Sequence, residues 1–404
     1  MAEAPLILIL VGLAAYTVLG GADFGAGLWE LTGRGPGGQA LRDHTHRAMA
    51  PVWEANHVWL IFVLVVCWTA YPPAFASITS TLTIPLFLAG IGIVLRGASY
   101  ALRSGIDTPR EEGVLSLVFA LSSVLTPFAL GATVGGIASA RVPVGNARGD
   151  AFDSWLNPTS ILIGTLAVAT AAYLAAVYLA GDATRMGNRD VAEAFRTRAL
   201  GAGIVAGAIA ATGPFVLHSD ARPLYDGLTS GTGLAALLVS AAAGIVTLTL
   251  VAARRYEPAR LSAAAAVAAI VAGWGLAQRP SFLPGLSIDE AAANDATITA
   301  LLIGFAVGLL ILLPSLAYLF RLVLTGRFDP AAPMPPPPPR ASSAAAALTS
   351  SRLESISAPI AAALLTLGAL VTFFSEGWLL AVGVTLMLAG ACALFLALVT
   401  AEDR

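Results

Sequence analysis

Long apolar runs dominate the chain, and most have the length that a helix needs to cross a membrane. A transmembrane helix takes about 20 predominantly apolar residues. Two late runs, near residues 357–374 and 377–400, predict a helical hairpin that turns at Ser375 to Gly377. Before them the pattern predicts nine spanning helices, near residues 5–31, 52–71, 81–103, 113–139, 158–180, 199–218, 229–252, 261–278 and 297–323.

A stretch rich in proline, alanine and serine separates these two groups of helices, and such composition is typical of a linker. The predicted organisation is therefore a nine-helix core at 1–325, a cytoplasmic linker at 326–356 and a transmembrane hairpin at 357–404. The fold class predicted from this pattern is an all-α polytopic membrane protein. The first apolar run lacks a basic flank and a small-residue cleavage site, so it is expected to remain as a span.

Composition supports the membrane class and argues against a nucleic-acid partner. Hydrophobic residues make up 57% of the chain and charged residues 11%, whereas soluble domains carry about 25% charged residues. The net charge of −2 also lacks the basic excess that nucleic-acid binding requires.

The basic residues, all of them arginine, predict the orientation. With the N-terminus outside and the C-terminus in the cytoplasm, seventeen arginines fall in inner segments. Arg96 lies within a span, and the four outer ones are Arg141, Arg148, Arg222 and Arg279. Cytoplasmic loops of membrane proteins carry an excess of basic residues, so the count favours this topology.

Three ionisable groups lie in separate apolar runs near their predicted inner ends: Asp23, Glu54 and Arg96. Ionisable residues at membrane depth are costly and mark functional sites by default. A buried arginine beside carboxylates would favour their ionised forms and offset the cost of burial. His57 follows Glu54 by three residues, so both face one side of their helix.

The residues alone allow several interpretations of the cluster of Asp23, Glu54 and Arg96. One is a proton path from the cytoplasm through Glu54 and Asp23. Another is a structural network that pins helices together, and a third is a stand-alone transporter. No metal site is expected, because di-iron bundles need two Glu-x-x-His motifs and only the one at Glu54 is present. His44 and His46 are expected to be polar surface residues of an inner loop.

Four motifs occur in order along the first helices: "GADFGAG", "PVWEANHVWLIF", "YPPAFA" and "LRGASYALR". Together they resemble subunit II of cytochrome bd-type quinol oxidases, and the likeness extends over about residues 1–325. The resemblance implies two four-helix bundles plus one peripheral helix. It further implies a subunit that supports an electrogenic, non-pumping enzyme, which oxidises quinol and reduces oxygen to water.

The resemblance also implies partners and cofactors. Subunit I would form a pseudosymmetric heterodimer with this chain and carry haem b and haem d, or haem b alone. No catalytic residue and no haem are then expected in this chain. A bound quinone or lipid and a small accessory subunit stay open, and the terminal hairpin is expected to replace such a subunit. A purely structural partner subunit is the remaining alternative.

By position in the motifs, Glu54 stands for the family's acidic residue where a proton path from the cytoplasm enters. Trp59 stands for a tryptophan that lines an oxygen path, and Asp23 and Arg96 match polar helix positions. Two departures affect this assignment. The acid is glutamate rather than aspartate, and His57 replaces a glutamine of relatives.

Overall fold

The computed structural model describes residues 1–32, 38–49, 53–102 and 109–324, together with six isolated positions between 363 and 389. The chain divides into two compact units, Met1–Asp329 and Pro330–Arg404. The predicted linker and hairpin fall outside the described residues, apart from those isolated positions.

Each of the nine predicted core spans coincides with a long helix. Eight helices of the described ranges are long and apolar enough to cross a membrane, and α3 adds a shorter apolar stretch, Asn56–Ala70. The predicted all-α polytopic class is therefore confirmed. The long helices are α1 (Ala4–Thr32), α3 (Trp53–Ala70), α5 (Thr83–Leu102), α6 (Pro109–Ala138), α7 (Pro158–Arg185), α8 (Arg189–Asp220), α10 (Gly231–Ala252), α11 (Tyr256–Gln278) and α13 (Asp295–Leu324).

Several helices extend beyond the apolar runs that predicted them. The run at 199–218 belongs to α8, which begins ten residues earlier at Arg189. Asn188 caps that end, because its side chain accepts a hydrogen bond from the N–H of Val191. A hydropathy run ends where charged residues begin, whereas a helix continues until its backbone is capped.

The structure also contains short elements that the hydropathy pattern did not predict. They are α2 (Gly38–Met49), α4 (Pro72–Thr81), α9 (Arg222–Leu228), α12 (Ile288–Ala291), β1 (Ser281–Leu283) and β2 (Leu286–Ser287). The two strands form an antiparallel hairpin around Pro284 and Gly285. Proline followed by a glycine with positive φ suits a tight turn, and Gly285 has a φ of +75°.

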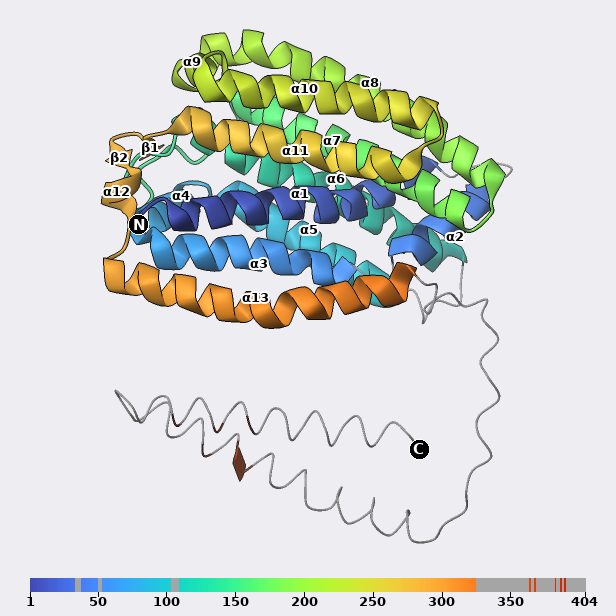
Figure 1. Cartoon of the computed structure of the whole chain (residues 1–404), viewed down its shortest axis with the longest axis horizontal. Helices are drawn as coiled ribbons and strands as arrows, with labels where there is room; N and C mark the ends of the chain where they lie inside the picture. The colour runs from blue at the N-terminus through green and yellow to red at the C-terminus, as the bar shows by residue number, and fades with distance from the viewer. Residues whose placement is uncertain are drawn as a thin grey trace. The chain divides into compact units, whose positions relative to one another are not determined.

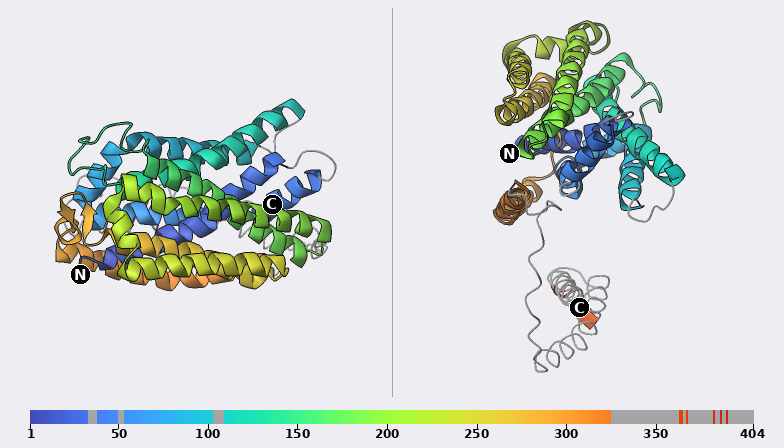
Figure 2. Two further views of the ribbon diagram at one scale, coloured as in Figure 1. Left: turned by 90° about the horizontal axis from the view of Figure 1, so that it is seen from above. Right: turned by 90° about the vertical axis from the view of Figure 1, so that its right-hand side faces the viewer.

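The long helices form two groups that meet at α1 and α7. Helix α1 packs against α3 and α6, and α6 against α5, whereas α7, α8, α10 and α11 form the second group. Helix α7 contacts both groups and is the most buried of the eight candidate spans. Helix α13 packs against α3 at the edge, as the right-hand view of Figure 2 shows.

The two ends of this helical array differ. The N-terminus, α4, α9, the β-hairpin and α12 lie at one end, and α2 lies at the other (Figure 1). The end that carries α2 is called the α2 end below. At the opposite end, Asp220 of α8 accepts hydrogen bonds from Arg141 (2.6 Å) and from the Thr159 hydroxyl of α7 (2.6 Å), which links the two groups.

Helix α12 provides a pH-dependent element outside the membrane spans. Ser287 and Glu290 form a reciprocal capping box, in which the Ser287 N–H donates to the Glu290 carboxylate at 2.9 Å. The backbone and hydroxyl groups of Ser287 hold the pKa of Glu290 below its ordinary value of 4.5. A carboxyl group with a lowered folded-state pKa stabilises the fold above its unfolded pKa, and this contribution is lost as the pH falls through the folded pKa.

We therefore expect the hydrogen-exchange protection factor at Glu290 to fall as the pH is lowered below 4.5. Ser287→Ala is the control, because it removes the capping box at every pH. Its protection should be low and independent of pH. If the unmodified protein showed equal protection at Glu290 above and below pH 4.5, the Glu290 carboxylate would not stabilise this capping box.

Candidate functional site

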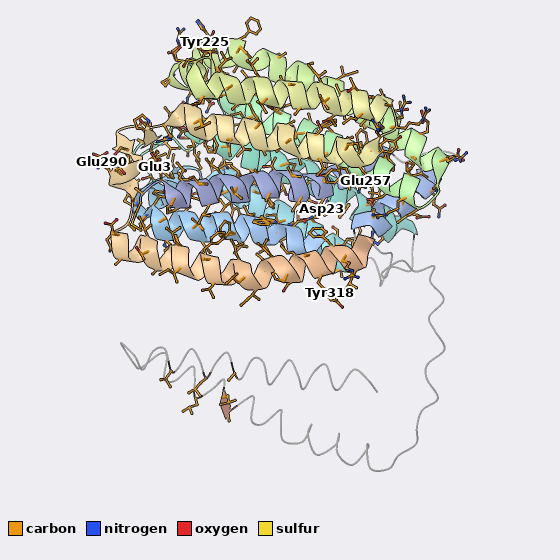
Figure 3. All side chains as sticks on the ribbon, in the orientation of Figure 1. Glu3, Asp23, Tyr225, Glu257, Glu290 and Tyr318 are labelled. Atoms are coloured by element: carbon orange, nitrogen blue, oxygen red, sulfur yellow. The ribbon has the colours of Figure 1, made fainter. Side chains whose placement is uncertain are left out.

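A buried ion pair joins α1 to α5 in the half of the molecule nearer the α2 end. Arg96 Nη2 lies 2.8 Å from Asp23 Oδ1, and Arg96 Nε donates to Asp23 Oδ2 at 3.3 Å. Only 2% of Arg96 and 1% of Asp23 is exposed. Figure 3 shows Asp23 inside the helical array, in the half that also carries Glu257 and away from Glu3 and Glu290.

Arg96 makes further contacts that offset the cost of burying its charge. Its Nη2 also donates to the backbone carbonyl of Asp23 at 2.8 Å, and its Nη1 donates to the Ser123 hydroxyl of α6. The guanidinium carbon lies 4.2 Å from the ring centroid of Phe119 and 5.2 Å from that of Phe24. Burying two charges is offset only when their geometry is good and their remaining hydrogen-bonding groups have partners. The contacts of Arg96 with Asp23 and Ser123 provide most of these partners.

The glycines of "GADFGAG" leave the space that these contacts need, because they have no side chain. A Cβ atom at Gly27 would lie 2.7 Å from Arg96 Nη1 and would also overlap Ser123. Two residues earlier, on the opposite face of the helix, a Cβ at Gly25 would lie 1.9 Å from the backbone oxygen of Ala171. Small residues at helix crossings let backbones approach closely. These two glycines follow Asp23 and let α5 and α6 approach one face of α1 and α7 approach another.

A small cavity adjoins the ion pair. It leaves ≈ 10 Å³ for the centre of a water-sized molecule, which is about enough for one water. Residues from α1, α2, α5 and α6 line it: Asp23, Ala26, Glu30, Thr45, His46, Arg96, Tyr100 and Phe119. The cavity therefore brings two carboxyl groups, an imidazole, a phenol and a guanidinium together.

A cluster of rings lies on the other side of Asp23, deeper in the membrane part. The His57 ring centroid lies 6.0 Å from that of Tyr16 and 5.9 Å from that of Phe24. Trp59 packs against the same buried cluster and makes an edge contact with Phe62. The predicted proton-path and oxygen-path residues His57 and Trp59 are thus neighbours of the ion-pair region.

The structure brings together three of the four predicted proton-path residues. Asp23 and Arg96 bond directly, and His57 contacts Phe24, the residue after Asp23. Glu54 belongs to the first turn of α3, and its side chain lies outside the described residues. Asn56, two residues later, donates to the Leu19 carbonyl of α1 at 3.2 Å, so the start of α3 packs within about one turn of Asp23.

Sequence reasoning missed part of the site and misjudged α2. Glu30 and His46 line the cavity, and the signal for Glu30 was its spacing of seven residues from Asp23, which places both on one helix face. The expectation that His44 is a surface residue is wrong. His44 is 2% exposed, and its Nε2 lies 3.1 Å from the Leu179 carbonyl of α7. Helix α2 is short and polar, but it packs onto α7 and α8.

The four histidines, the side chains best suited to bind a metal ion or a haem, all have contacts within this chain. No group of three or more His, Cys, Asp or Glu side chains that could hold a metal ion occurs among the described residues. His44 packs against Phe195, and His46 stacks on Tyr100 with a centroid distance of 5.1 Å. His57 lies between Tyr16 and Phe24, and His218 contacts Arg222. All four histidines are thus engaged within this chain.

Residues 1–323 match the family model of cytochrome bd terminal oxidase subunit II. The chain is 25% identical over 221 residues to the putative cytochrome bd menaquinol oxidase subunit II of Bacillus subtilis (strain 168), covering 53% of this chain and 61% of that protein. It is 26% identical over 185 residues to cytochrome bd-I ubiquinol oxidase subunit 2 of Escherichia coli (strain K12), covering 43% and 46%. The matched stretches thus span 61% and 46% of these relatives.

The fold is also similar to that of a chain in the bd oxidase from Geobacillus thermodenitrificans. The TM-score is 0.64 at 23% sequence identity, and the match covers 80% of this chain and 98% of that chain. At this identity the likeness shows a shared fold.

Proposed function

Because the chain belongs to the cytochrome bd terminal oxidase subunit II family, we propose that it is the haem-free subunit of a quinol:oxygen oxidoreductase. In this proposal the chain forms a pseudosymmetric heterodimer with a subunit I and supplies protons, and through Trp59 oxygen, to the reaction there. The complex is electrogenic but does not pump protons. Its haems, b and d or b alone, supply the electron-transfer and oxygen chemistry when bound in subunit I.

One observation carries the proposed proton path: the buried Asp23–Arg96 pair adjoins a water-sized cavity toward one end of the helical array. Arg96 holds the Asp23 carboxyl group in place through an ion pair and two side-chain hydrogen bonds, beside the cavity. An ionised carboxylate beside water can accept a proton and release it again. Glu54 and His57, at the start of the neighbouring helix α3, are the other proposed groups of this path.

The distribution of arginines supports placing the α2 end in the cytoplasm. In that orientation the path takes protons from the cytoplasm for the formation of water, while the N-terminus of the chain is outside. The engaged state of the four histidines supports placing the haems in subunit I. A quinone or lipid bound to this chain, and replacement of an accessory subunit by the terminal hairpin, are proposed from the family resemblance.

A second candidate function is that of a purely structural partner subunit. The extensive hydrogen bonding of Arg96, which joins α1, α5 and α6, favours it. A stand-alone transporter has less support. Transporters bind their substrates at interrupted helices near the membrane centre, whereas α1 and α5 continue unbroken through Asp23 and Arg96.

We expect Glu54→Gln to slow quinol-driven oxygen consumption by about tenfold or more, because relay groups typically contribute at least that much. The purified complex is assayed with a reduced quinol, and its haem spectrum confirms assembly. Glu257→Gln is the matched control: this acid lies on α11 in the same half of the molecule, and 71% of its side chain is exposed. It should leave turnover unchanged.

The unmodified complex tests the function itself. A preparation that lacks a haem-bearing partner, or that consumes no oxygen with quinol, would refute the oxidase proposal. An active complex in which Glu54→Gln turns over normally would leave this chain with the structural role.

A further inference from the structure

Three polar residues on α1 form a row that leads from the α2 end into the membrane part: Glu30, Asp23 and Tyr16. Each is seven residues from the next. Seven residues are close to two turns, so the three side chains share one face and are separated by about 10 Å of helix rise each. All three are at least 95% buried.

Glu30 and His46 occupy the part of the row nearest the end of α1. Glu30 is 5% exposed, lies two residues before the last residue of α1, and lines the cavity together with Asp23. Side chains on a helix tilt toward its N-terminus, so Glu30 leans back toward Asp23. His46 of α2 lines the same cavity while stacked on Tyr100 of α5.

Tyr16 extends the row on the far side of Asp23. A Cβ at Gly20 would lie 2.9 Å from Cε2 of the Tyr16 ring, so the ring lies along the helix surface in the direction of Asp23. The Tyr16 hydroxyl is buried and makes no hydrogen bond within the described residues. His57 makes an edge contact with this ring.

We propose that Glu30, assisted by His46, is the group that takes up protons from the cytoplasm, and that the row on α1 carries them inward. This inference rests on the proposed function and names the uptake group of the same site. It assigns the entrance to residues of α1 and α2, whereas the family resemblance assigns it to Glu54 on α3.

Each step in the row is a proton transfer without any change of oxidation state. A hydronium ion at the α2 end gives a proton to the Glu30 carboxylate and becomes water, and Glu30 passes the proton to a water in the cavity. That water releases a proton to an Asp23 carboxylate oxygen. On its far side Asp23 gives the proton up to a water, which carries it toward the Tyr16 hydroxyl and the His57 ring, because that hydroxyl makes no hydrogen bond within the described residues.

The placement of Glu30 suits an uptake group. Its carboxyl group and the Asp23–Arg96 pair face the same cavity, so a proton that reaches Glu30 has a short way to Asp23. The other titratable groups on the cavity wall are His46 from α2 and Tyr100 from α5. A proton relay works through direct contact or one intervening water, and the cavity leaves about the space that the centre of one water needs.

The test compares Glu30→Gln, Glu30→Asp and Glu257→Gln in the purified complex with subunit I, over a range of pH. We expect Glu30→Gln to lower oxygen consumption about tenfold at neutral pH, with the deficit growing as the pH rises and protons become scarce. Glu30→Asp retains a carboxyl group and should keep at least half of the turnover. Glu257→Gln should match the unmodified complex at every pH.

A second readout separates proton uptake from a structural role. Reduction of the haems by quinol without oxygen consumes no cytoplasmic protons, so its rate should be unchanged in Glu30→Gln. If haem reduction slows as much as oxygen consumption, Glu30 has a structural role and the inference is wrong. If Glu30→Gln turns over normally while Glu54→Gln is slow, the entrance is at Glu54 and the inference is again wrong.

Ala26→Val covers the case in which Glu30→Gln fails to assemble. Ala26 is 1% exposed and lines the cavity, so a larger side chain fills the space of the water and leaves every titratable group in place. Slow turnover with normal haem reduction would support the row, and unchanged turnover would overturn it. An unmodified complex without activity would instead refute the proposed function.

Discussion

Replacing Arg96 by leucine will destabilise the protein by about 3–5 kcal/mol, because it leaves the Asp23 charge buried without a partner. Asp23 is 1% exposed, and its ion pair with this one arginine consists of two side-chain hydrogen bonds. Leucine supplies neither charge nor donor. The measurement is the yield of assembled complex in the membrane, together with its thermal midpoint in detergent.

The double variant Asp23→Leu/Arg96→Leu is the informative control. A buried ion pair is often replaced by apolar residues at little cost, whereas removal of one partner is costly. We therefore expect the double variant to recover most of the stability lost in Arg96→Leu, and a double-mutant cycle to give a large coupling energy. If both variants were equally unstable, the lost packing of Arg96 against the rings of Phe24 and Phe119 would be the cause instead.

The double variant also separates structure from function. It restores the packing of α1 against α5 but removes the Asp23 carboxyl group from the proposed path. A stable double variant with a normal haem spectrum and slow oxygen consumption would show that the pair serves proton transfer. Normal turnover would show that the pair serves only to hold the helices together.

Replacing Gly25 by alanine will have the second large effect. The added methyl group would lie 1.9 Å from the carbonyl oxygen of Ala171 and 2.3 Å from its carbonyl carbon. Because both are backbone atoms of α7, no side-chain rotation relieves the overlap. Overpacking a core costs about 1–3 kcal/mol when side chains can adjust, and we expect a loss at or above the upper value here.

Gly207→Ala is the matched control for this substitution. Gly207 lies within α8, is exposed, and has nothing within 4 Å of a built Cβ. Alanine in a helix is favoured over glycine by about 0.5–1 kcal/mol, so this variant should be neutral or slightly more stable. The measurement is the thermal midpoint of each variant. A Gly25→Ala variant as stable as Gly207→Ala would contradict the close contact of α1 with α7.

The membrane class and the positions of the long helices were predictable from the sequence, because a span depends on the length and polarity of one continuous segment. The arginine count gave an orientation for the same reason. The ends of the helices were less predictable. Helix α8 continues ten residues before its apolar run, since capping at Asn188 rather than hydropathy sets its start.

The ion pair was partly predictable. Two opposite charges at similar depth in neighbouring helices have few other ways to offset their burial, so Asp23 and Arg96 were expected to lie near each other. The third partner on α6, Ser123, was not predicted, because serine is common in apolar helices and only the contact at Gly27 brings it close.

The sequence by itself therefore determined that this protein is a bundle of membrane helices with an Asp23–Arg96 pair at one depth. Only the tertiary structure decided which further groups meet that pair. Glu30 and Tyr16 join it because the rotation of α1 turns one face toward α5 and α6, and His46 joins it because α2 packs against the array. These contacts depend on packing between segments far apart in the chain, which no local pattern of polar and apolar residues specifies.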